Sequence, residues 1–336
     1  MKIQEKLLLK PKDFNKGSKG KKIDGVFNPA AVRMKDGRIF LFVRVAEELN
    51  KIPKKEIEKQ NGNVILLRSG VYILSNISHF RRVYLDETGF NVKYISEKPD
   101  FTGGGCEAEL GVEDPRIVRI GGSYIMTYVS VDLRDWVSTS IALSKDLKNW
   151  KRKGIIFRNK NKDVVIFPEK INGRYVSLNR PEGSLKFSGP SISISYSKNL
   201  VKWNNKKSII KTRKNSWDSE RIGAGTPPIK TKKGWLFFYH GVSLNKNKKQ
   251  IYSAGSVLLN LKNPEKVIAR TPTRKPLFKP DKSYEKSGFV NNVVFPTGII
   301  LDKNKKDILI YSGAGDKYVT VRKIPIKDIL ASMEYY

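Results

Sequence analysis

The chain has 336 residues, 39% of them hydrophobic, which is enough apolar surface for a large buried core. Its 65 lysines and arginines outnumber 32 aspartates and glutamates, so the formal net charge is +33 at pH 7. No apolar run approaches the roughly 18 residues of a membrane span, and the leucines at 7–9 are too few for a signal-peptide core. The single cysteine, Cys106, excludes an internal disulfide and is typical of a reducing compartment. We therefore expect a cytoplasmic protein.

A proline followed by two short β-prone runs recurs along the chain. The copies begin at Asn28-Pro29, Asp114-Pro115, Phe167-Pro168, Thr226-Pro227 and Phe295-Pro296. Proline can open a strand, and a polar turn that usually holds glycine separates the two runs, so each copy predicts a β-hairpin. The prolines at 115, 168, 228 and 296 are 53, 60 and 68 residues apart, which leaves room for four strands per unit. The pattern predicts an all-β fold, a five-bladed β-propeller, with an irregular β-sandwich as the alternative.

We expect one catalytic domain over residues 1–336, with 1–22 and 322–336 as peripheral extensions. The first unit is the longest, with 86 residues between Pro29 and Pro115, and its charged stretch 47–63 is interpreted as a loop over one face. The second and third units continue into Asp/Asn-Leu-x-x-Trp turns at 146–150 and 199–203, whose Leu and Trp should fold back on the sheet. Trp235 should be in the core, whereas Trp217 is a candidate for the rim of a site.

Polar residues stand at the ends of strongly apolar predicted strands. They are Asn28, Asp114 and Glu169 at the openings of three units, and Arg44, Arg180, His240 and Asp316 at the far ends of hairpins. A solvated strand end explains any one of them. Several at equivalent positions of a ring would converge in its central funnel and favour a binding site there.

The positive charge has two interpretations. It would suit nucleic acid, since covered phosphates release counterions. The lysines, however, are spread over nearly every predicted turn without interleaved aromatic residues, so we expect a lysine-rich surface or a high-salt cytoplasm and only secondary nucleic-acid contact. No metal site is predicted, because the only histidines are His79 and His240, and Gly103–Gly105 lacks the Gly-Lys-Ser/Thr of a phosphate-binding loop.

Five motifs, in order, resemble those of glycoside hydrolase family 130. They are Gly111-Val-Glu-Asp114-Pro-Arg116, Phe167-Pro-Glu-Lys170, Gly223-Ala-Gly225-Thr-Pro-Pro, Tyr239-His240-Gly241 and Phe295-Pro-Thr-Gly298. The resemblance runs over about residues 27–321 and is greatest to the branch that includes phosphorylases of β-1,2-linked mannosides and mannooligosaccharides. It implies a five-bladed propeller that cleaves β-mannosides with inorganic phosphate as co-substrate and no other cofactor.

The resemblance also implies roles for individual residues. Asp114 would be the one catalytic carboxylate, a general acid whose proton reaches the glycosidic oxygen through a sugar hydroxyl. One acid suffices for inverting phosphorolysis because phosphate attacks the opposite face, whereas a hydrolase needs a second carboxylate to activate water. The matching phosphate-binding positions are Lys162, Arg180, His240, Arg221 and Tyr252. The matching sugar-binding positions are Asn28, Arg44 and Asp316.

Two positions depart from the family pattern. Asn179 stands where the family more often has His, and Tyr311-Ser-Gly-Ala-Gly-Asp316 replaces Tyr-Gly-Ala-Ala-Asp. Acceptor specificity should depend on residues 47–63 and Trp136.

The favoured function is an inverting phosphorylase that yields α-D-mannose 1-phosphate and a shortened acceptor. One alternative is an inverting β-mannosidase on the same fold, with Glu107, Glu109 or Glu169 as the base. The other is a non-catalytic basic propeller that binds RNA or an acidic partner. The linkage, the acceptor, the physiological direction and a possible homo-oligomer are left open by the sequence.

Overall fold

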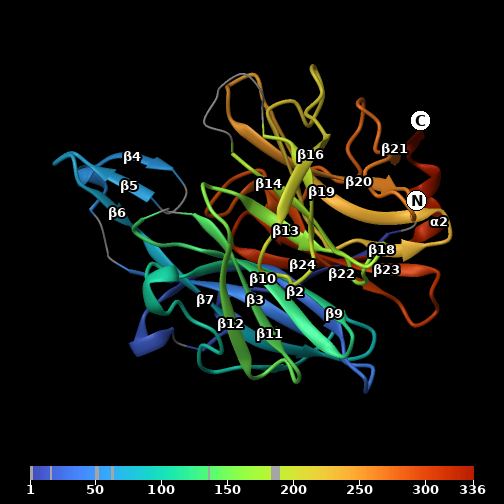
Figure 1. Ribbon diagram of the computed structural model, residues 1–336. Coiled ribbons are helices and arrows are strands. Elements are labelled where there is room, and N and C mark those ends of the chain that lie inside the picture. The colour runs from blue at the N-terminus through green and yellow to red at the C-terminus, as the bar shows by residue number, and fades with distance from the viewer. Residues whose placement is uncertain (1–2, 16, 50–52, 62–63, 135–136, 183–189) are drawn as a thin grey trace.

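The computed structural model describes residues 3–15, 17–49, 53–61, 64–134, 137–182 and 190–336 (Figure 1). The regular secondary structure of this described chain is almost entirely antiparallel β-sheet, so the all-β prediction is confirmed. The two α-helices, α1 (Ser283–Lys286) and α2 (Ile326–Ala331), are short, and no helix in these ranges is long and apolar enough to cross a membrane. The 3-10 turns are η1 (Pro11–Asp13), η2 (Ser18–Gly20), η3 (Lys54–Glu56) and η4 (Gly105–Glu107).

Five sheets follow one another along the chain. The first contains β2 (Ile23–Arg33), β3 (Ile39–Glu48), β7 (Asn76–Leu85) and β8 (Val92–Ile95). The second contains β9 (Val112–Ile120), β10 (Ser123–Ser130), β11 (Ser138–Ser144) and β12 (Trp150–Phe157). The third contains β13 (Lys162–Ile166), β14 (Tyr175–Arg180), β15 (Ile192–Ser197) and β16 (Asn204–Ile210).

The remaining strands complete the fourth and fifth sheets. The fourth contains β17 (Arg221–Ala224), β18 (Ile229–Thr231), β19 (Gly234–Leu244), β20 (Gln250–Leu259), β21 (Val267–Arg270) and β25 (Glu334–Tyr335). The fifth contains β22 (Val294–Leu301), β23 (Asp307–Ala314), β24 (Tyr318–Pro325) and, from the other end of the chain, β1 (Gln4–Leu9).

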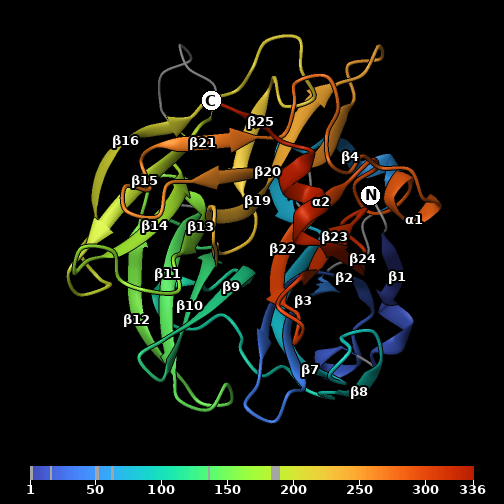
Figure 2. The same ribbon diagram turned by 90° about the vertical axis from the view of Figure 1, so that its right-hand side faces the viewer.

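Each sheet packs against the next. Strand β2 contacts both β9 and β22, β9 contacts β13, β13 contacts β17, and β19 contacts β22. The fifth sheet therefore also lies beside the first, and Figure 2 shows the sheets arranged around a shared centre. The space between them is filled by apolar side chains such as Val43 of the first sheet, Tyr311 of the fifth and Phe237 of the fourth, all fully buried.

The recurring prolines do not all mark the same place. Pro29, Pro115 and Pro296 lie inside β2, β9 and β22, the first strands of their sheets. Pro168, in contrast, lies in the turn after β13, so Glu169 is not at the opening of a sheet and that interpretation is wrong. The first strand of the third sheet contains no proline, and Pro168 lies in the turn that follows this strand. The side chain of Glu169 is 47% exposed and pairs with Lys230 at 2.6 Å.

The tryptophan predictions are confirmed except for one. Leu147 and Leu200 are buried, with Trp150 and Trp203 packed against the same clusters, and Trp235 is buried. Trp217 was interpreted as a rim residue, and this is wrong. It is buried and its Nε1–H donates to the Pro272 carbonyl at 2.9 Å.

The stretch 47–63 is not simply a loop. Strand β3 continues to Glu48, and the described part of the stretch then forms η3 and β4 (Ile57–Asn61). Strand β4 pairs with β5 (Val64–Leu67), and β5 pairs with β6 (Tyr72–Leu74). This three-stranded sheet stands apart from the other five, at the upper left of Figure 1.

We expect Leu9→Ala to lower the free energy of unfolding by about 2–5 kcal/mol, because Leu9 is the last residue of β1 and its side chain is fully buried in the core between the first and fifth sheets. Ile3→Ala, at a position that is 37% exposed just before β1, is the control and should change stability little. Urea unfolding measures both. Equal stability of the two variants would contradict the assigned role of β1.

Candidate active site

Three polar residues occupy equivalent bulges in the first strands of neighbouring sheets. Asn28, Asp114 and Asp163 have left-handed backbones, with φ of 46°, 50° and 56°. At each one the register shifts, so that two residues of the strand face one residue of the neighbouring strand. A bulge redirects a side chain that a regular strand would hold to one face, and after glycine it is Asn and Asp that adopt the left-handed region most readily. The three bulges explain why these side chains lie together.

The carboxylate of Asp114 is held by one of its two oxygens. Oδ1 accepts hydrogen bonds from Asn28 Nδ2 at 2.9 Å and from Arg44 Nη1 at 3.0 Å. Within the described part of the chain, Oδ2 has no hydrogen-bond partner. One oxygen is therefore fixed by two donors, and the other can carry a proton.

Arg44 connects Asp114 with its neighbour in sequence. Its Nη2 donates to Glu113 Oε1 at 2.6 Å, its Nε donates to Ser78 Oγ at 3.0 Å, and its guanidinium lies 4.6 Å from the centre of the Phe27 ring. Every nitrogen of the guanidinium thus has an acceptor, so its orientation beside Asp114 is fixed.

Asp316 joins this group from the fifth sheet. It lies in the three-residue turn between β23 and β24, where Gly315 and Asp316 have φ of 57° and 50° and the backbone N–H of Lys317 donates to the Ala314 carbonyl at 3.1 Å. Burial raises its pKa to about 7; the charge of Arg44 opposes this rise, while Asp114 and Glu113 add to it. The carboxylate cluster is the set Asn28, Arg44, Glu113, Asp114 and Asp316.

The third sheet supplies a second group, in which Arg180 is central. Arg180 is buried; its Nε donates to Asp163 Oδ2 and its Nη1 to Glu182 Oε1, both at 2.6 Å. Lys162 lies directly opposite Arg180 in the register of β13 and β14. Burial opposes ionisation of Asp163, but the nearby cations, Arg180 first among them, hold its pKa well below the usual range. Asp163 therefore acts as the counterion of this group.

His240 of the fourth sheet lies next to Asp163 in this group but carries no charge at neutral pH. Burial, above all, lowers its pKa to about 3. Its ring stacks on Phe295 with the centroids 4.3 Å apart, and Nε2 lies 3.6 Å from Asp163 Oδ2. A Cβ on Gly223 would lie 2.1 Å from that same oxygen, which explains the glycine. His240 can donate a hydrogen bond to an anion, but it cannot add positive charge.

Arg221 and Tyr252 lie beside His240. Arg221 Nη2 donates to the Tyr252 hydroxyl, and the Tyr252 ring centre is 6.2 Å from that of His240. Burial raises the pKa of Tyr252, so its hydroxyl remains protonated at neutral pH. The cation cluster is the set Lys162, Asp163, Arg180, Glu182, Arg221, His240 and Tyr252.

Arg116 interacts electrostatically with a carboxylate of each cluster. These carboxylates are Asp114 and Asp163, and the guanidinium of Arg116 is buried. Asp316 and Arg180 in turn both act on the hydroxyl of Tyr252. The structure therefore brings all nine residues predicted for the site into one place.

Sequence reasoning missed Asp163, Arg116 and Glu182 as members of the site. Arg116 was within reach, because it belongs to the quoted Asp114 motif. Asp163 had no proline after it to mark the bulge. Trp136 falls outside the described residues. Among the described residues, no group of three or more His, Cys, Asp and Glu could hold a metal ion.

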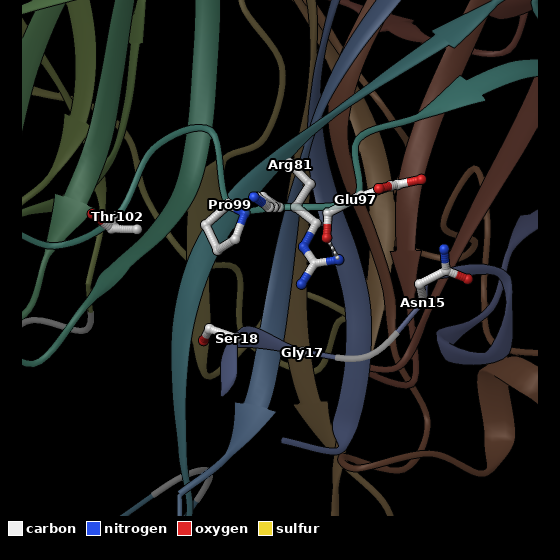
Figure 3. A pocket seen from close by; sticks show the side chains of 8 residues that line it. Asn15, Gly17, Ser18, Arg81, Glu97, Pro99 and Thr102 are labelled. Carbon is white, nitrogen blue, oxygen red and sulfur yellow. Dashed lines mark hydrogen bonds between the residues drawn. The ribbon is translucent and has the colours of Figure 1, made fainter. Parts of the chain in front are cut away.

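A groove of about 840 Å³ lies elsewhere (Figure 3). Its lining residues include Ser18, Arg81, Glu97 and Pro99. Arg81 is the register partner of Val43, the residue next to Arg44 in β3, and successive residues of a strand point to opposite faces. The groove therefore lies on the other side of the first sheet from Asp114. Arg81 Nη1 donates to the Glu97 carbonyl at 3.0 Å, as Figure 3 shows.

The raised pKa of Asp316 predicts a pH-dependent stability. Between about pH 4 and pH 7 the folded chain keeps a proton that the unfolded chain, with the ordinary pKa of 3.8, has released. The free energy of unfolding should therefore fall as the pH rises through this window. Asp316→Asn should show a smaller fall in Tm between pH 4.5 and pH 7.5 than the unmodified chain. The same fall in both proteins would refute the assignment.

Known proteins resemble this chain in both sequence and structure. A family model for glycoside hydrolase family 130, described as β-1,4-mannooligosaccharide phosphorylase, matches residues 3–335. A 1,2-β-oligomannan phosphorylase of Thermoanaerobacter sp. (strain X514) is 42% identical over 66% of this chain and 71% of its own length. A β-1,2-mannobiose phosphorylase of Listeria innocua is 32% identical over 98% of this chain and 97% of its own.

A solved structure of a relative also matches this chain over nearly its whole length. The β-1,2-mannobiose phosphorylase from Listeria innocua, in complex with β-1,2-mannobiose, superposes with a TM-score of 0.88 at 28% identity and covers 99% of both chains. The match therefore extends from sequence to three-dimensional structure over nearly every residue. The motifs around Asp114, the shared fold and the family model lead to one conclusion: the chain belongs to glycoside hydrolase family 130.

Proposed function

We propose that this chain is an inverting glycoside phosphorylase. It cleaves a β-mannoside, most readily a β-1,2-linked one, with inorganic phosphate and releases α-D-mannose 1-phosphate and a shortened acceptor. The observation that carries this proposal is the carboxyl group of Asp114, which has one oxygen without a hydrogen-bond partner in the described chain and lies near a cluster of cations that includes the buried Arg180. The names of the relatives support the substrate class.

Asp114 is the general acid of the proposed reaction. A proton on Oδ2 passes toward the glycosidic oxygen, directly or through a sugar hydroxyl, as the bond to the acceptor breaks. The donors on Oδ1, Asn28 Nδ2 and Arg44 Nη1, then stabilise the carboxylate that remains. Because phosphate itself attacks the opposite face of the sugar, no second carboxylate is needed to activate water.

The cation cluster binds the phosphate. Lys162, Arg180 and Arg221 supply positive charge, and the hydroxyl of Tyr252 and the neutral imidazole of His240 supply further hydrogen-bond donors. Burial and the charge of Arg180 lower the pKa of Lys162, and a phosphate dianion beside it would favour the charged form. Asp163 and Glu182 orient Arg180 in advance of binding.

The carboxylate cluster holds the sugar that is transferred. Asn28, Arg44 and Asp316 surround Asp114, and their polar atoms suit the hydroxyls of a mannose ring. With a pKa of about 7, Asp316 can either donate to a hydroxyl or accept from one near neutral pH.

The proposed fold is a single-domain five-bladed β-propeller. The cyclic order of contacts between the sheets supports it, as does the pairing of β1 with β24, which joins the two ends of the chain in one sheet. Phosphate is the only co-substrate. A charged product that does not cross membranes suits a cytoplasmic location.

The hydrolase alternative has little support in the geometry. Glu169 is exposed and paired with Lys230 at 2.6 Å, in the turn after β13. Glu109 Oε1 accepts from the backbone of Leu133 at 3.3 Å. Neither is hydrogen-bonded to a residue of the carboxylate cluster.

Phosphate dependence tests the function directly. With β-1,2-mannooligosaccharide and phosphate, the enzyme should release mannose 1-phosphate, and without phosphate it should release almost nothing. Asp114→Asn should lower kcat about 10²- to 10⁴-fold, because the proton donor is lost. Glu169→Gln is the matched control and should retain activity. Free mannose as the main product would overturn the proposal.

Variants of Arg180 test the phosphate site. Arg180→Ala would leave Asp163 buried without its partner, at a cost of about 3–5 kcal/mol, so Arg180→Lys is the better probe. We expect its KM for phosphate to rise about tenfold or more while the KM for the mannoside changes little, because lysine cannot reproduce the guanidinium fork. Arg174→Lys, at an exposed position just before β14, is the control. An unchanged KM for phosphate in Arg180→Lys would exclude this role.

A further inference from the structure

Arg116 joins two parts of the site that come from different sheets. Its Nε donates to the carbonyl of Gly225 at 2.5 Å, and its Nη1 donates to the carbonyl of Pro115 at 3.1 Å. Pro115 directly follows Asp114 in the bulge of the second sheet, and Gly225 directly follows β17 of the fourth sheet. One side chain thus links the acid's own backbone to a segment 109 residues away.

Ion pairing does not account for this buried arginine. Arg116 is 3% exposed, and in the described chain no carboxylate oxygen lies within 4.0 Å of its guanidinium. Its Nη2 is buried and has no hydrogen-bond partner there. Burial of an unpaired cation destabilises a fold, and an apolar side chain of similar volume is often tolerated as well or better. Stability alone is therefore a poor explanation for this residue.

The end of β17, to which Arg116 is hydrogen-bonded, is itself tightly packed in the site. A Cβ on Gly223 would lie 2.1 Å from Asp163 Oδ2 and 2.4 Å from His240 Cε1. A Cβ on Gly225 would lie 2.3 Å from the carbonyl of Pro296. The end of β17 therefore has almost no freedom to move relative to the cation cluster, and a side chain hydrogen-bonded to it is held in the same position.

We infer that Arg116 is a positioning residue that sets the acid Asp114 at a fixed distance from the bound phosphate. It does so by connecting the Asp114–Pro115 bulge to residues 223–225 at the end of β17, which pack against Asp163 and His240. The inference rests on the proposed phosphorolysis, in which acid and nucleophile act on opposite sides of one bond. A displacement of about 1 Å between such groups can lower a rate about 100-fold.

Arg116→Met tests the inference, because it keeps the volume and removes both hydrogen bonds. We expect kcat to fall about 100-fold while the KM values for phosphate and mannoside stay within about threefold, and Tm should be equal or higher. Arg116→Lys can reach one of the two carbonyls and should recover part of kcat. Arg119→Met is the matched control: Arg119 is exposed on the same strand and lies over Tyr124.

The outcomes separate this inference from the proposed function. If the unmodified chain and Arg119→Met make mannose 1-phosphate, the function stands, and only the Arg116 variants decide the role of Arg116. A kcat of Arg116→Met within threefold of the unmodified chain would overturn the inference. So would a steep rise in the KM for phosphate at constant kcat, because Arg116 would then bind the phosphate itself. If Arg116→Met does not fold, Arg116→Lys decides by the same split between kcat and KM.

Discussion

The left-handed bulge at Asp114 is the constraint on which the site depends. In a regular strand, Asp114 and its neighbours would alternate between the two faces of the second sheet. The bulge, matched at Asn28 and Asp163, instead turns polar side chains of three successive sheets toward one another. A left-handed residue other than glycine costs free energy, and the two hydrogen bonds on Asp114 Oδ1 help to offset that cost.

The charges at the centre are closely matched, which suits an anionic co-substrate. The basic residues are Arg44, Arg116, Lys162, Arg180 and Arg221; the acidic ones are Glu113, Asp114, Asp163, Glu182 and Asp316. Partial protonation of Asp316, whose pKa is raised to about 7, leaves an excess of positive charge, which a phosphate dianion would neutralise. This local balance is independent of the net charge of +33, which the sequence places largely in the turns.

Much of the fold could be predicted, because strands and turns have local signals. The alternating runs and the proline–glycine punctuation predicted the hairpins around Pro29, Pro115 and Pro296. The proline signal failed at Pro168, since the third sheet opens with Asp163 and no proline follows it. It also gave no warning that the charged stretch after Glu47 contributes a strand to a separate sheet, because β4, with the sequence Ile-Glu-Lys-Gln-Asn, has no alternating apolar face.

The sequence by itself determined the all-β class, the family motifs and the nine residues that gather at the site, since each rests on a local pattern or on resemblance. Only the tertiary structure decided how those residues are connected. The bond from Arg116 to Gly225 and the ion pair of Arg180 with Asp163 depend on which segments meet in space. So does the charge of His240, because its pKa is set by burial between the fourth and fifth sheets, and burial cannot be read from one strand alone.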